Sequence, residues 1–268
     1  MLLVFVTGES CFSAYISSNT KLKVGSKVDL VFSIHLHQRD IKLLEKIRIF
    51  FKSAGNIQIN ADGSITYAVT SVKDLSDYII PHFEKYPLLT QKQADFELFK
   101  QIVELMKSKE HLNVEGIQKL VNIRASMNKG LSKRLAIAFP NIIPEAKPEF
   151  KLVQNSNLSN TNYWLAGFVT GEGCFFVKTS KSKTHKLGIS VSLNFIVVQN
   201  IRDTELINNL ISILGCGSVT ISEKSAIIRY TVTNFSEILE HIIPIFFFFR
   251  AAQKPKKKKM VSNIRWKI

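Results

Sequence analysis

The sequence contains two copies of one pattern, and this duplication constrains the fold more than any other feature. The segment LLVFVTGESCF at residues 2–12 recurs as LAGFVTGEGCF at residues 165–175, so Glu9 and Glu172 lie 163 positions apart. The same separation relates further identical residues: Gly25 and Gly188, Phe32 and Phe195, Arg39 and Arg202, Asp40 and Asp203, Tyr67 and Tyr230, Thr70 and Thr233, and Pro81 and Pro244. A register kept over this length indicates an internal duplication. We therefore expect two similar half-domains, each with one copy of the acidic motif.

Hydrophobic periodicity predicts the same elements in each half. Residues 11–17 and 28–36 alternate apolar and polar side chains, as strands with one buried face do, whereas residues 40–51 have the spacing of a helix. Asp62-Gly63 is a strong hairpin signal between two further strands, and Pro81 is expected to end a second helix that begins at residue 73. Each half is therefore predicted to be an α+β unit with a four-stranded antiparallel sheet.

The distribution of prolines and helical patterns predicts the domain boundaries. Residues 1–139 are expected to form the first half-domain, because helical patterns at 92–106, 114–127 and 131–139 continue it after Pro81. Residues 140–162 are rich in Pro, Asn and Ser, which is typical of a linker. Residues 163–249 are expected to form the second half-domain, which lacks the helices that follow Pro81 in the first. Residues 250–268 are expected to be a disordered basic tail.

The chain is strongly basic, with a net charge of +15 and a sequence pI near 9.7. Residues 250–268 hold eight of these positive charges and no acid, which leaves +7 for the rest of the chain. A basic body favours a polyanionic partner such as nucleic acid. The three cysteines lack the spacing of a zinc site or a disulfide framework, which favours a reducing compartment. The apolar runs are too short for a membrane span, so no membrane partner is expected.

The acidic motif indicates a metal site. Residues 163–171 have the pattern of a short buried helix, and Gly173 suits the position just past its end. Glu172 would then lie at the negative end of the helix dipole, where a carboxylate needs a nearby cation. A solvated helix end would explain Glu172 alone, but the duplicate argues against that reading. Small residues on this helix allow a second helix to approach closely, so Glu9 and Glu172 are expected to meet.

Two such carboxylates suit a particular chemistry. Together with the carbonyl oxygens of Gly8 and Gly171 they form an all-oxygen site that suits Mg²⁺ or a similar hard cation. Beside this site, the two sheets present faces rich in Ser, Thr, Lys and Tyr, which suit a DNA groove. A basic saddle with a metal-bound carboxylate pair at its centre indicates phosphodiester hydrolysis.

The segments WLAGFVTGEGCF and LLVFVTGESCF resemble the signature helices of LAGLIDADG homing endonucleases in their single-chain form with two repeats. IIPHFEKYPLLTQK (79–92), KEHLNVEGI (109–117) and MNKG (127–130) resemble the branch encoded in fungal mitochondrial introns. This resemblance covers residues 2–245. It implies two pseudo-symmetric αββαββα half-domains, with a saddle of two antiparallel sheets around a central two-helix interface. It also implies a monomer, acting in the mitochondrion, that cleaves both strands of a double-stranded DNA target with Mg²⁺ or Mn²⁺ for intron homing.

Carried over by position, the resemblance implies that Glu9 and Glu172 are catalytic and bind the metal, helped by the backbone of Gly8 and Gly171. It also implies DNA contacts from outward-facing strand positions: Ser13, Tyr15, Ser17, Asn19, Thr66 and Thr70 in the first half, and Lys178, Ser180, Ser182, Lys183, Arg229, Thr231 and Thr233 in the second. His35 and His37 are expected to make packing or backbone contacts rather than to act in catalysis.

The first motif helix departs from the family pattern. Leu3 and Val4 stand where the second helix has Ala166 and Gly167, and Ser10 replaces the glycine after the acid. The bulkier residues are expected to force the helices apart or to shift the carboxylates. Two alternatives to the endonuclease therefore stay open: an RNA maturase that assists splicing of its host group I intron RNA, and a catalytically decayed DNA-binding relic.

Overall fold

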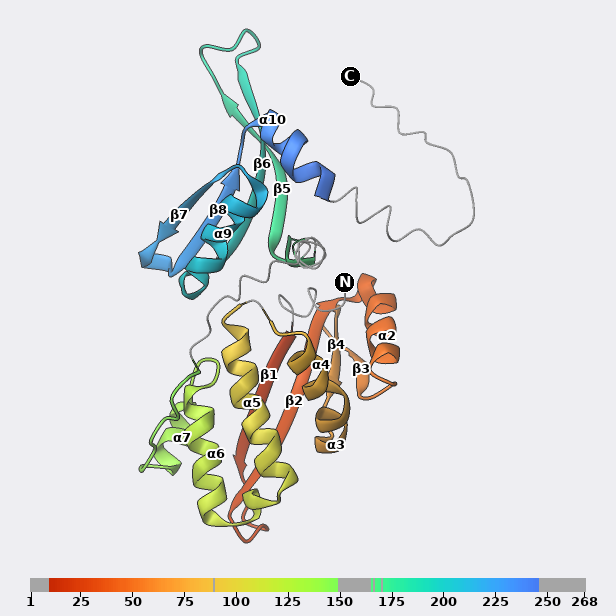
Figure 1. The fold of residues 1–268 in the computed structure, drawn as a ribbon, viewed down its shortest axis with the longest axis vertical. Helices are drawn as coiled ribbons and strands as arrows, with labels where there is room; N and C mark the ends of the chain where they lie inside the picture. Colours follow the sequence, from red (N-terminus) through yellow and green to blue (C-terminus); the bar gives the residue numbers. More distant parts are fainter. Residues whose placement is uncertain (1–9, 89, 149–164, 166, 170, 246–268) are drawn as a thin grey trace.

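The computed structural model describes residues 10–88, 90–148, 165, 167–169 and 171–245. It contains two four-stranded antiparallel sheets, one in each half of the chain (Figure 1). The strands of the first sheet lie in the order β1-β2-β4-β3 and those of the second in the order β5-β6-β8-β7. The predicted α+β class and antiparallel sheets are confirmed. The first motif helix, most of the expected linker and the basic tail lie outside the described residues.

The described strands fall into two matching sets: β1 (Ser10–Ser18), β2 (Ser26–His37), β3 (Asn56–Ile59) and β4 (Ser64–Val69), then β5 (Gly173–Lys181), β6 (Ile189–Asn200), β7 (Ser218–Ser222) and β8 (Ile227–Val232). The labelled helices are α2 (Ile41–Phe50), α3 (Val72–Asp74), α4 (Ile80–Lys85), α5 (Lys92–Lys107), α6 (Val114–Ser126), α7 (Lys133–Ala138), α9 (Thr204–Leu214) and α10 (Phe235–Glu237). A shift of 163 positions carries β1, β2 and β4 onto β5, β6 and β8. The duplication in sequence is therefore a duplication of structure. None of the described helices is long and apolar enough to cross a membrane.

The first sheet buries one face and exposes the other. On β1 the side chains of Phe12 and Ala14 are buried, while Tyr15 points to the opposite, exposed face. Phe12 lies at the centre of an aromatic cluster, with its ring 5.3–5.4 Å from four others: Phe32, Phe83, Phe96 and Phe99. Alternation along the strand therefore decides which side of the sheet becomes the core.

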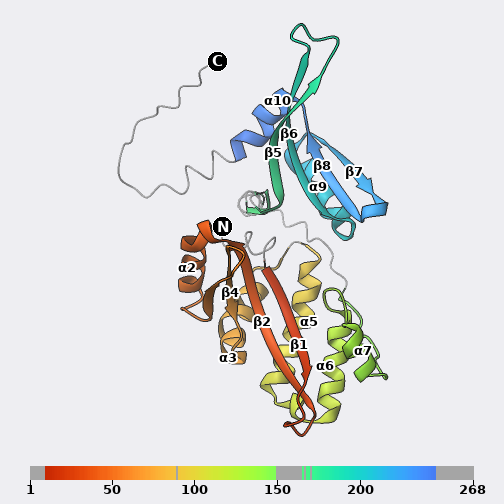
Figure 2. The same cartoon turned by 180° about the vertical axis from the view of Figure 1, so that it is seen from behind.

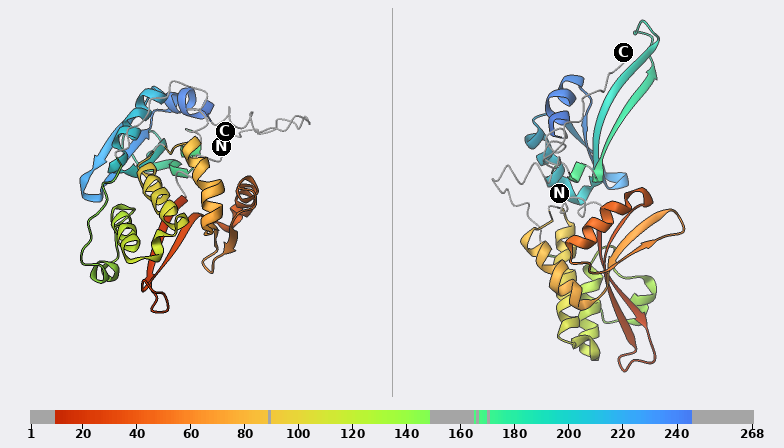
Figure 3. Two further views of the ribbon diagram at one scale, coloured as in Figure 1. Left: turned by 60° about the horizontal axis from the view of Figure 1, so that its bottom comes forward. Right: turned by 90° about the vertical axis from the view of Figure 1, so that its right-hand side faces the viewer.

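Helices α5 and α6 cover the buried face of the first sheet and leave the other face open (Figures 2 and 3). Two side chains near the end of α6 also reach the backbone of β1. Arg124 donates from Nε to the carbonyl of Ala14 (2.8 Å), and Asn128 donates from Nδ2 to the carbonyl of Phe12 (2.8 Å). Because β1 is the edge strand of its sheet, these bonds satisfy acceptors that no neighbouring strand reaches.

The second sheet has the same apolar face but less cover. Phe175 and Val177 on β5 are 52% and 61% exposed, whereas their counterparts Phe12 and Ala14 are each 2% exposed. The described part of the second half includes no counterpart of α5 and α6, and the β5–β6 hairpin extends away from the rest of that half (Figure 1). Among the described residues, the core of the second half is consequently the smaller of the two.

Pro81 does not end its helix, so that expectation is wrong. α3 leads through a π-helical segment, Leu75–Ile79, directly into α4. The amide of Ile80 donates to the carbonyl of Leu75, five residues earlier. This wider turn makes room for the ring of Pro81, which would clash with the preceding turn of a regular α-helix and has no N–H to donate. The second half repeats the wide turn at Ile238–Ile242, just before its own proline.

His82 on α4 is enclosed by aromatic side chains. Its ring lies 5.0–5.3 Å from four others: Phe50, Phe51, Phe83 and Tyr86. Its Nε2 is buried and has no hydrogen-bond partner among the described residues. Burial lowers the pKa of His82 from 6.5 to about 4. The duplicate position in the second half is Ile245, so an apolar residue fits the same turn.

Stability is expected to fall as the pH decreases from 6.5 towards 4, because in this window the unfolded chain binds a proton at His82 that the folded chain excludes. His82→Ile should remove this part of the pH dependence. At about pH 5 it should raise the free energy of unfolding by on the order of 1 kcal/mol, less than the full shift implies because His82 is only partly buried. Urea denaturation of both proteins at acidic and neutral pH measures the difference. An identical pH dependence in both would argue against a buried neutral histidine.

The duplicated phenylalanines should respond differently to truncation. Phe12→Ala is expected to lower the free energy of unfolding by about 3–5 kcal/mol, because it leaves a cavity among buried rings. Phe175→Ala should lower it by less than about half as much, since half of that side chain is already exposed. Chemical denaturation of the two variants provides the measurement. Equal losses would mean that the second sheet is covered as well as the first.

Candidate active site and nucleic-acid interface

A helix that turns directly into β5 carries the second acidic motif. Leu165, Phe168 and Val169 are buried, which confirms the predicted apolar face of this helix. Glu172 is the last helical residue and is half-buried, and Gly173 begins the strand. A Cβ atom at Gly173 would lie 2.5 Å from the carbonyl oxygen of Val169. Close approach of two backbone segments, rather than a left-handed conformation, therefore selects glycine at this position.

The first acidic motif is described only from Ser10 onward, so Glu9 and Gly8 lie outside the described residues, whereas Gly171 lies in the second motif helix. Ser10 is buried at the start of β1, and its carbonyl accepts a hydrogen bond from Nζ of Lys92 (3.1 Å). β1 and β5 both begin at the junction of the two halves (Figures 1 and 2). The residues that follow the two acids therefore start from the same region of the molecule.

Lys92 is a candidate functional residue that periodicity and spacing did not reveal. It is the first residue of α5, and its ammonium group lies beside the residue that follows Glu9. A positive charge at this place reduces the electrostatic repulsion between carboxylates that are held close together. The segment that carries part of the family resemblance ends at Lys92, but its contact with β1 joins residues 82 positions apart. The resemblance could have indicated Lys92 itself, whereas its contact with β1 became visible only in the folded chain.

The oxygen donors at the junction suit a hard divalent cation. Glu172 offers a carboxylate, and Gly171 offers a carbonyl near a helix end, where carbonyl groups lack intrahelical partners. The buried Oγ of Ser10 has no hydrogen-bond partner among the described residues and is a further oxygen in this region. Within the described ranges, no group of three or more His, Cys, Asp or Glu side chains could hold a metal ion.

The outward face of the first sheet holds most of the DNA contacts predicted in that half. Three of them alternate with core residues along β1: Ser13, Tyr15 and Ser17. Thr66 lies on the same face of β4, and Thr70 follows the end of that strand. Asn19 lies in the turn after β1, where its Oδ1 accepts a hydrogen bond from the amide of Lys21 (3.1 Å). The structure thus gathers the predicted residues on one face and at its ends.

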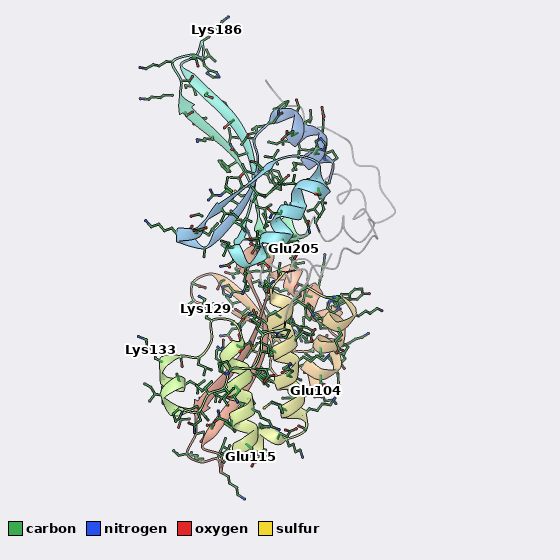
Figure 4. All side chains as sticks on the ribbon, turned by 60° about the vertical axis from the view of Figure 1, so that its left-hand side comes forward. Glu104, Glu115, Lys129, Lys133, Lys186 and Glu205 are labelled. Atoms are coloured by element: carbon green, nitrogen blue, oxygen red, sulfur yellow. The ribbon has the colours of Figure 1, made fainter. Side chains whose placement is uncertain are left out.

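The second sheet repeats this arrangement with more basic side chains. Four predicted contacts share its outward face: Lys178 and Ser180 on β5, and Arg229 and Thr231 on β8. Ser182 and Lys183 lie in the β5–β6 turn, where Ser182 Oγ is hydrogen-bonded to Nδ1 of His185 (2.7 Å). Lys186 lies at the tip of this hairpin, far from the junction (Figure 4). Thr233 follows the end of β8. Basic groups therefore extend from the sheet to the hairpin tip.

His35 and His37 are exposed on the outward face of the first sheet. Nδ1 of His35 is hydrogen-bonded to Oγ1 of Thr66 (2.9 Å), and Asn60 donates from Nδ2 to the same oxygen (3.0 Å). The expectation of a packing or backbone contact is therefore wrong for His35, because strand alternation places it opposite the core. It is right for His37, whose Nδ1 accepts a hydrogen bond from the amide of Arg39 (3.2 Å).

The sequence matches a family model described as LAGLIDADG endonuclease at residues 2–103 and 165–267. Two curated relatives from Neurospora crassa are named probable intron-encoded endonuclease 2 and probable intron-encoded endonuclease 3. They are 36% identical over 253 residues and 35% identical over 242 residues, each match covering 90% of this chain. The chain spans 54% and 44% of their lengths, so it corresponds to about half of each relative.

Solved structures match the fold closely. The I-SmaMI LAGLIDADG homing endonuclease bound to cleaved DNA is 39% identical, with a TM-score of 0.87, over 93% of this chain and 82% of that chain. I-SmaMI bound to an uncleaved DNA target in the presence of calcium ions is also 39% identical, with a TM-score of 0.87, over 93% and 83% of the two chains. The two sheets and their connections are therefore those of single-chain endonucleases of this kind.

Gly173→Ala is expected to distort the turn from helix to strand, because the added Cβ would meet the carbonyl of Val169. The free energy of unfolding should fall by about 1–3 kcal/mol, as for other overpacked sites. Ser10→Ala is the matched control at the duplicate position, which already carries a Cβ, and it should be neutral or slightly stabilising. Urea denaturation provides the comparison, and equal effects of the two substitutions would show that the contact with Val169 is unimportant.

Proposed function

Because this chain belongs to the LAGLIDADG endonuclease family, we propose that it is a site-specific DNA endonuclease that makes double-strand breaks by divalent-metal-dependent phosphodiester hydrolysis. The observation that carries the proposal is the position of Glu172, at the end of a helix that turns directly into a strand whose outward face carries Lys178 and Ser180. Its duplicate, Glu9, directly precedes the matching strand β1. One acid in each half suits a reaction on the two strands of a duplex.

The outward faces of the two sheets form the proposed DNA surface. A two-stranded β-ribbon fits the major groove of B-DNA, and β5–β6 is a ribbon of this kind. Lys178 lies on its outward face, and Arg229 lies on the same face of the adjacent strand β8. Lys183 and Lys186 lie in the turn of the ribbon. Lysine and arginine contacts to phosphates dominate such affinity and make it dependent on salt. His35, Thr66 and Asn60 offer hydrogen-bonding groups for reading base edges from the first sheet.

In the proposed site, the carboxylates of Glu9 and Glu172 and the carbonyls of Gly8 and Gly171 would hold Mg²⁺ or Mn²⁺. A divalent cation bound there would stabilise charge on the phosphate and lower the pKa of a bound water. Lys92, anchored by the carbonyl of Ser10, adds a positive charge beside the reacting phosphate. In this proposal the fold brings the carboxylates of Glu9 and Glu172 and the ammonium group of Lys92 together at the junction of the two halves.

The proposed biological setting follows from the two repeats and from the relatives. Both acids belong to one chain, so a monomer on double-stranded DNA is sufficient for the reaction. The intron-encoded relatives and the resemblance to the fungal branch favour a mitochondrial protein that acts in intron homing. Their names favour an endonuclease over an RNA maturase. Splicing assistance that survives a substitution of Glu172 would instead support the maturase.

Glu172→Gln should lower cleavage by about 100-fold or more and leave DNA affinity nearly unchanged, because the amide keeps the shape of the side chain but loses an anionic metal ligand. Glu205→Gln is the matched control, since it makes the same charge change at an exposed residue of α9 (Figure 4). It should cleave like the wild type. Cleavage is measured with Mg²⁺ on a library of duplexes that span exon junctions, beside reactions in EDTA, and binding is measured by fluorescence anisotropy.

Three outcomes would count against the proposal. Unchanged cleavage by the Glu172→Gln protein would exclude the metal site as assigned. Cleavage that persists in EDTA would exclude dependence on a divalent cation. A wild-type protein that binds duplex DNA but cuts it with neither Mg²⁺ nor Mn²⁺ would identify a DNA-binding relic.

A further inference from the structure

A contact between the two halves fastens the start of α5. Oδ1 of Asp203 accepts a hydrogen bond from the backbone amide of Gln91 (2.7 Å). Gln91 directly precedes α5, and its amide is one of the N–H groups that a helix leaves without an intrahelical partner at its start. Asp203 belongs to the other half, where it directly precedes α9 but forms no side-chain hydrogen bond that caps that helix. Its side chain therefore accepts a hydrogen bond at the start of α5 rather than at the start of α9.

The contact is buried and surrounded by charge. Asp203 is 5% exposed, and burial raises the pKa of its carboxyl group. Arg202 lies between two acids, with Nε 3.7 Å from Oδ2 of Asp203 and Nη1 3.8 Å from Oδ2 of Asp95. Asp95, in the first turn of α5, also accepts hydrogen bonds from the amide of Asn128 (2.9 Å) and from Nζ of Lys147 (2.7 Å). Both acids lie where the dipole of α5 favours negative charge.

The duplication supplies an internal comparison. Arg39-Asp40 in the first half has the same Nε–Oδ2 distance, 3.7 Å, as Arg202-Asp203 in the second. The side chain of Asp40 is 42% exposed, however, whereas that of Asp203 is 3% exposed. The position that corresponds to Gln91 in the second half lies outside the described residues. Contact with α5, rather than the local turn, therefore accounts for the burial of Asp203.

Gln91 connects this contact to the proposed active site. Lys92 follows it in the chain, and Nζ of Lys92 donates to the carbonyl of Ser10, the residue after Glu9. The charge of Lys92 is also one of those that act on Asp203. Fixing the backbone at Gln91 thus fixes the point from which the Lys92 side chain reaches β1.

We propose that Asp203 is a positioning residue for DNA cleavage, which fastens the start of α5 to the second half and thereby holds the Lys92 ammonium group beside the acidic centre. This inference rests on the proposed endonuclease function. It makes the geometry of the centre depend on a contact between the halves, so that neither half can assemble the centre alone.

Asp203→Ala should lower the single-turnover cleavage rate by about tenfold or more, while DNA affinity changes by less than about threefold. Asp203→Asn keeps an oxygen that can accept the Gln91 amide and should recover most of the lost rate. Asp40→Ala is the matched substitution in the first half. It should leave both the rate and the melting temperature near the wild-type values, because its side chain is already half-exposed.

The combination of Asp203→Ala with Lys92→Met separates positioning from stability. If Asp203 acts through Lys92, the double variant should cleave as slowly as Lys92→Met alone. A purely structural role would make the two losses multiply, and the loss in Asp203→Ala would follow the fraction of unfolded protein. Multiplying losses, or full cleavage by Asp203→Ala, would overturn the inference.

A wild-type protein that cleaves no duplex would refute the proposed function, and amide hydrogen exchange would then test the contact itself. Faster exchange at Gln91 and Lys92 in Asp203→Ala, with unchanged exchange in the core strands, would support the fastening of α5. Unchanged exchange at these two amides would overturn it.

Discussion

Each half of the molecule is built on a sheet that is apolar on one face and polar on the other, and the apolar face has to be covered. In the first half α5 and α6 provide the cover, and Phe12 lies among four aromatic rings. The same requirement turns the polar face outward, where Lys178 and Arg229 are exposed in the second half. Successive side chains along a strand point to opposite faces of the sheet. A side chain that packs into the core therefore places the side chains before and after it on the solvent face. The proposed DNA surface is therefore the reverse side of the core rather than a separate addition to the fold.

The two copies are alike in their strands and different in their surroundings. β5 pairs with β6 as β1 pairs with β2, yet the face that α5 covers in the first half is half-exposed in the second. Asp203 is buried against α5, whereas its duplicate Asp40 is not. A centre that takes one acid from each copy depends on how the copies are held together. The hydrogen bond from Gln91 to Asp203 and the ion pairs of Arg202 are described contacts that hold them.

Much of the fold could be predicted because alternation and the repeat both record which side chains are buried. The strands, the hairpin at Asp62-Gly63 and the apolar face of the second motif helix follow directly from them. The helix that continues through Pro81 could not be predicted, because a π-helical turn leaves no distinct period in the sequence. His35 could have been placed by extending the alternation of β2. The contacts of Lys92 and Asp203 join residues 82 and 112 positions apart, which no local pattern reveals. The meeting of Glu9 and Glu172 stays a prediction, since Glu9 lies outside the described residues.

If Glu9 and Glu172 share one divalent cation, a crystal structure of the chain on its DNA target with Mn²⁺ will show it most directly. Anomalous scattering locates the Mn²⁺ independently of the protein atoms. We expect a Mn²⁺ within roughly 2.0–2.6 Å of carboxylate oxygens from both residues, at the junction where β1 and β5 begin. A Mn²⁺ bound by Glu172 alone, with the carboxylate of Glu9 out of reach, would contradict the shared site.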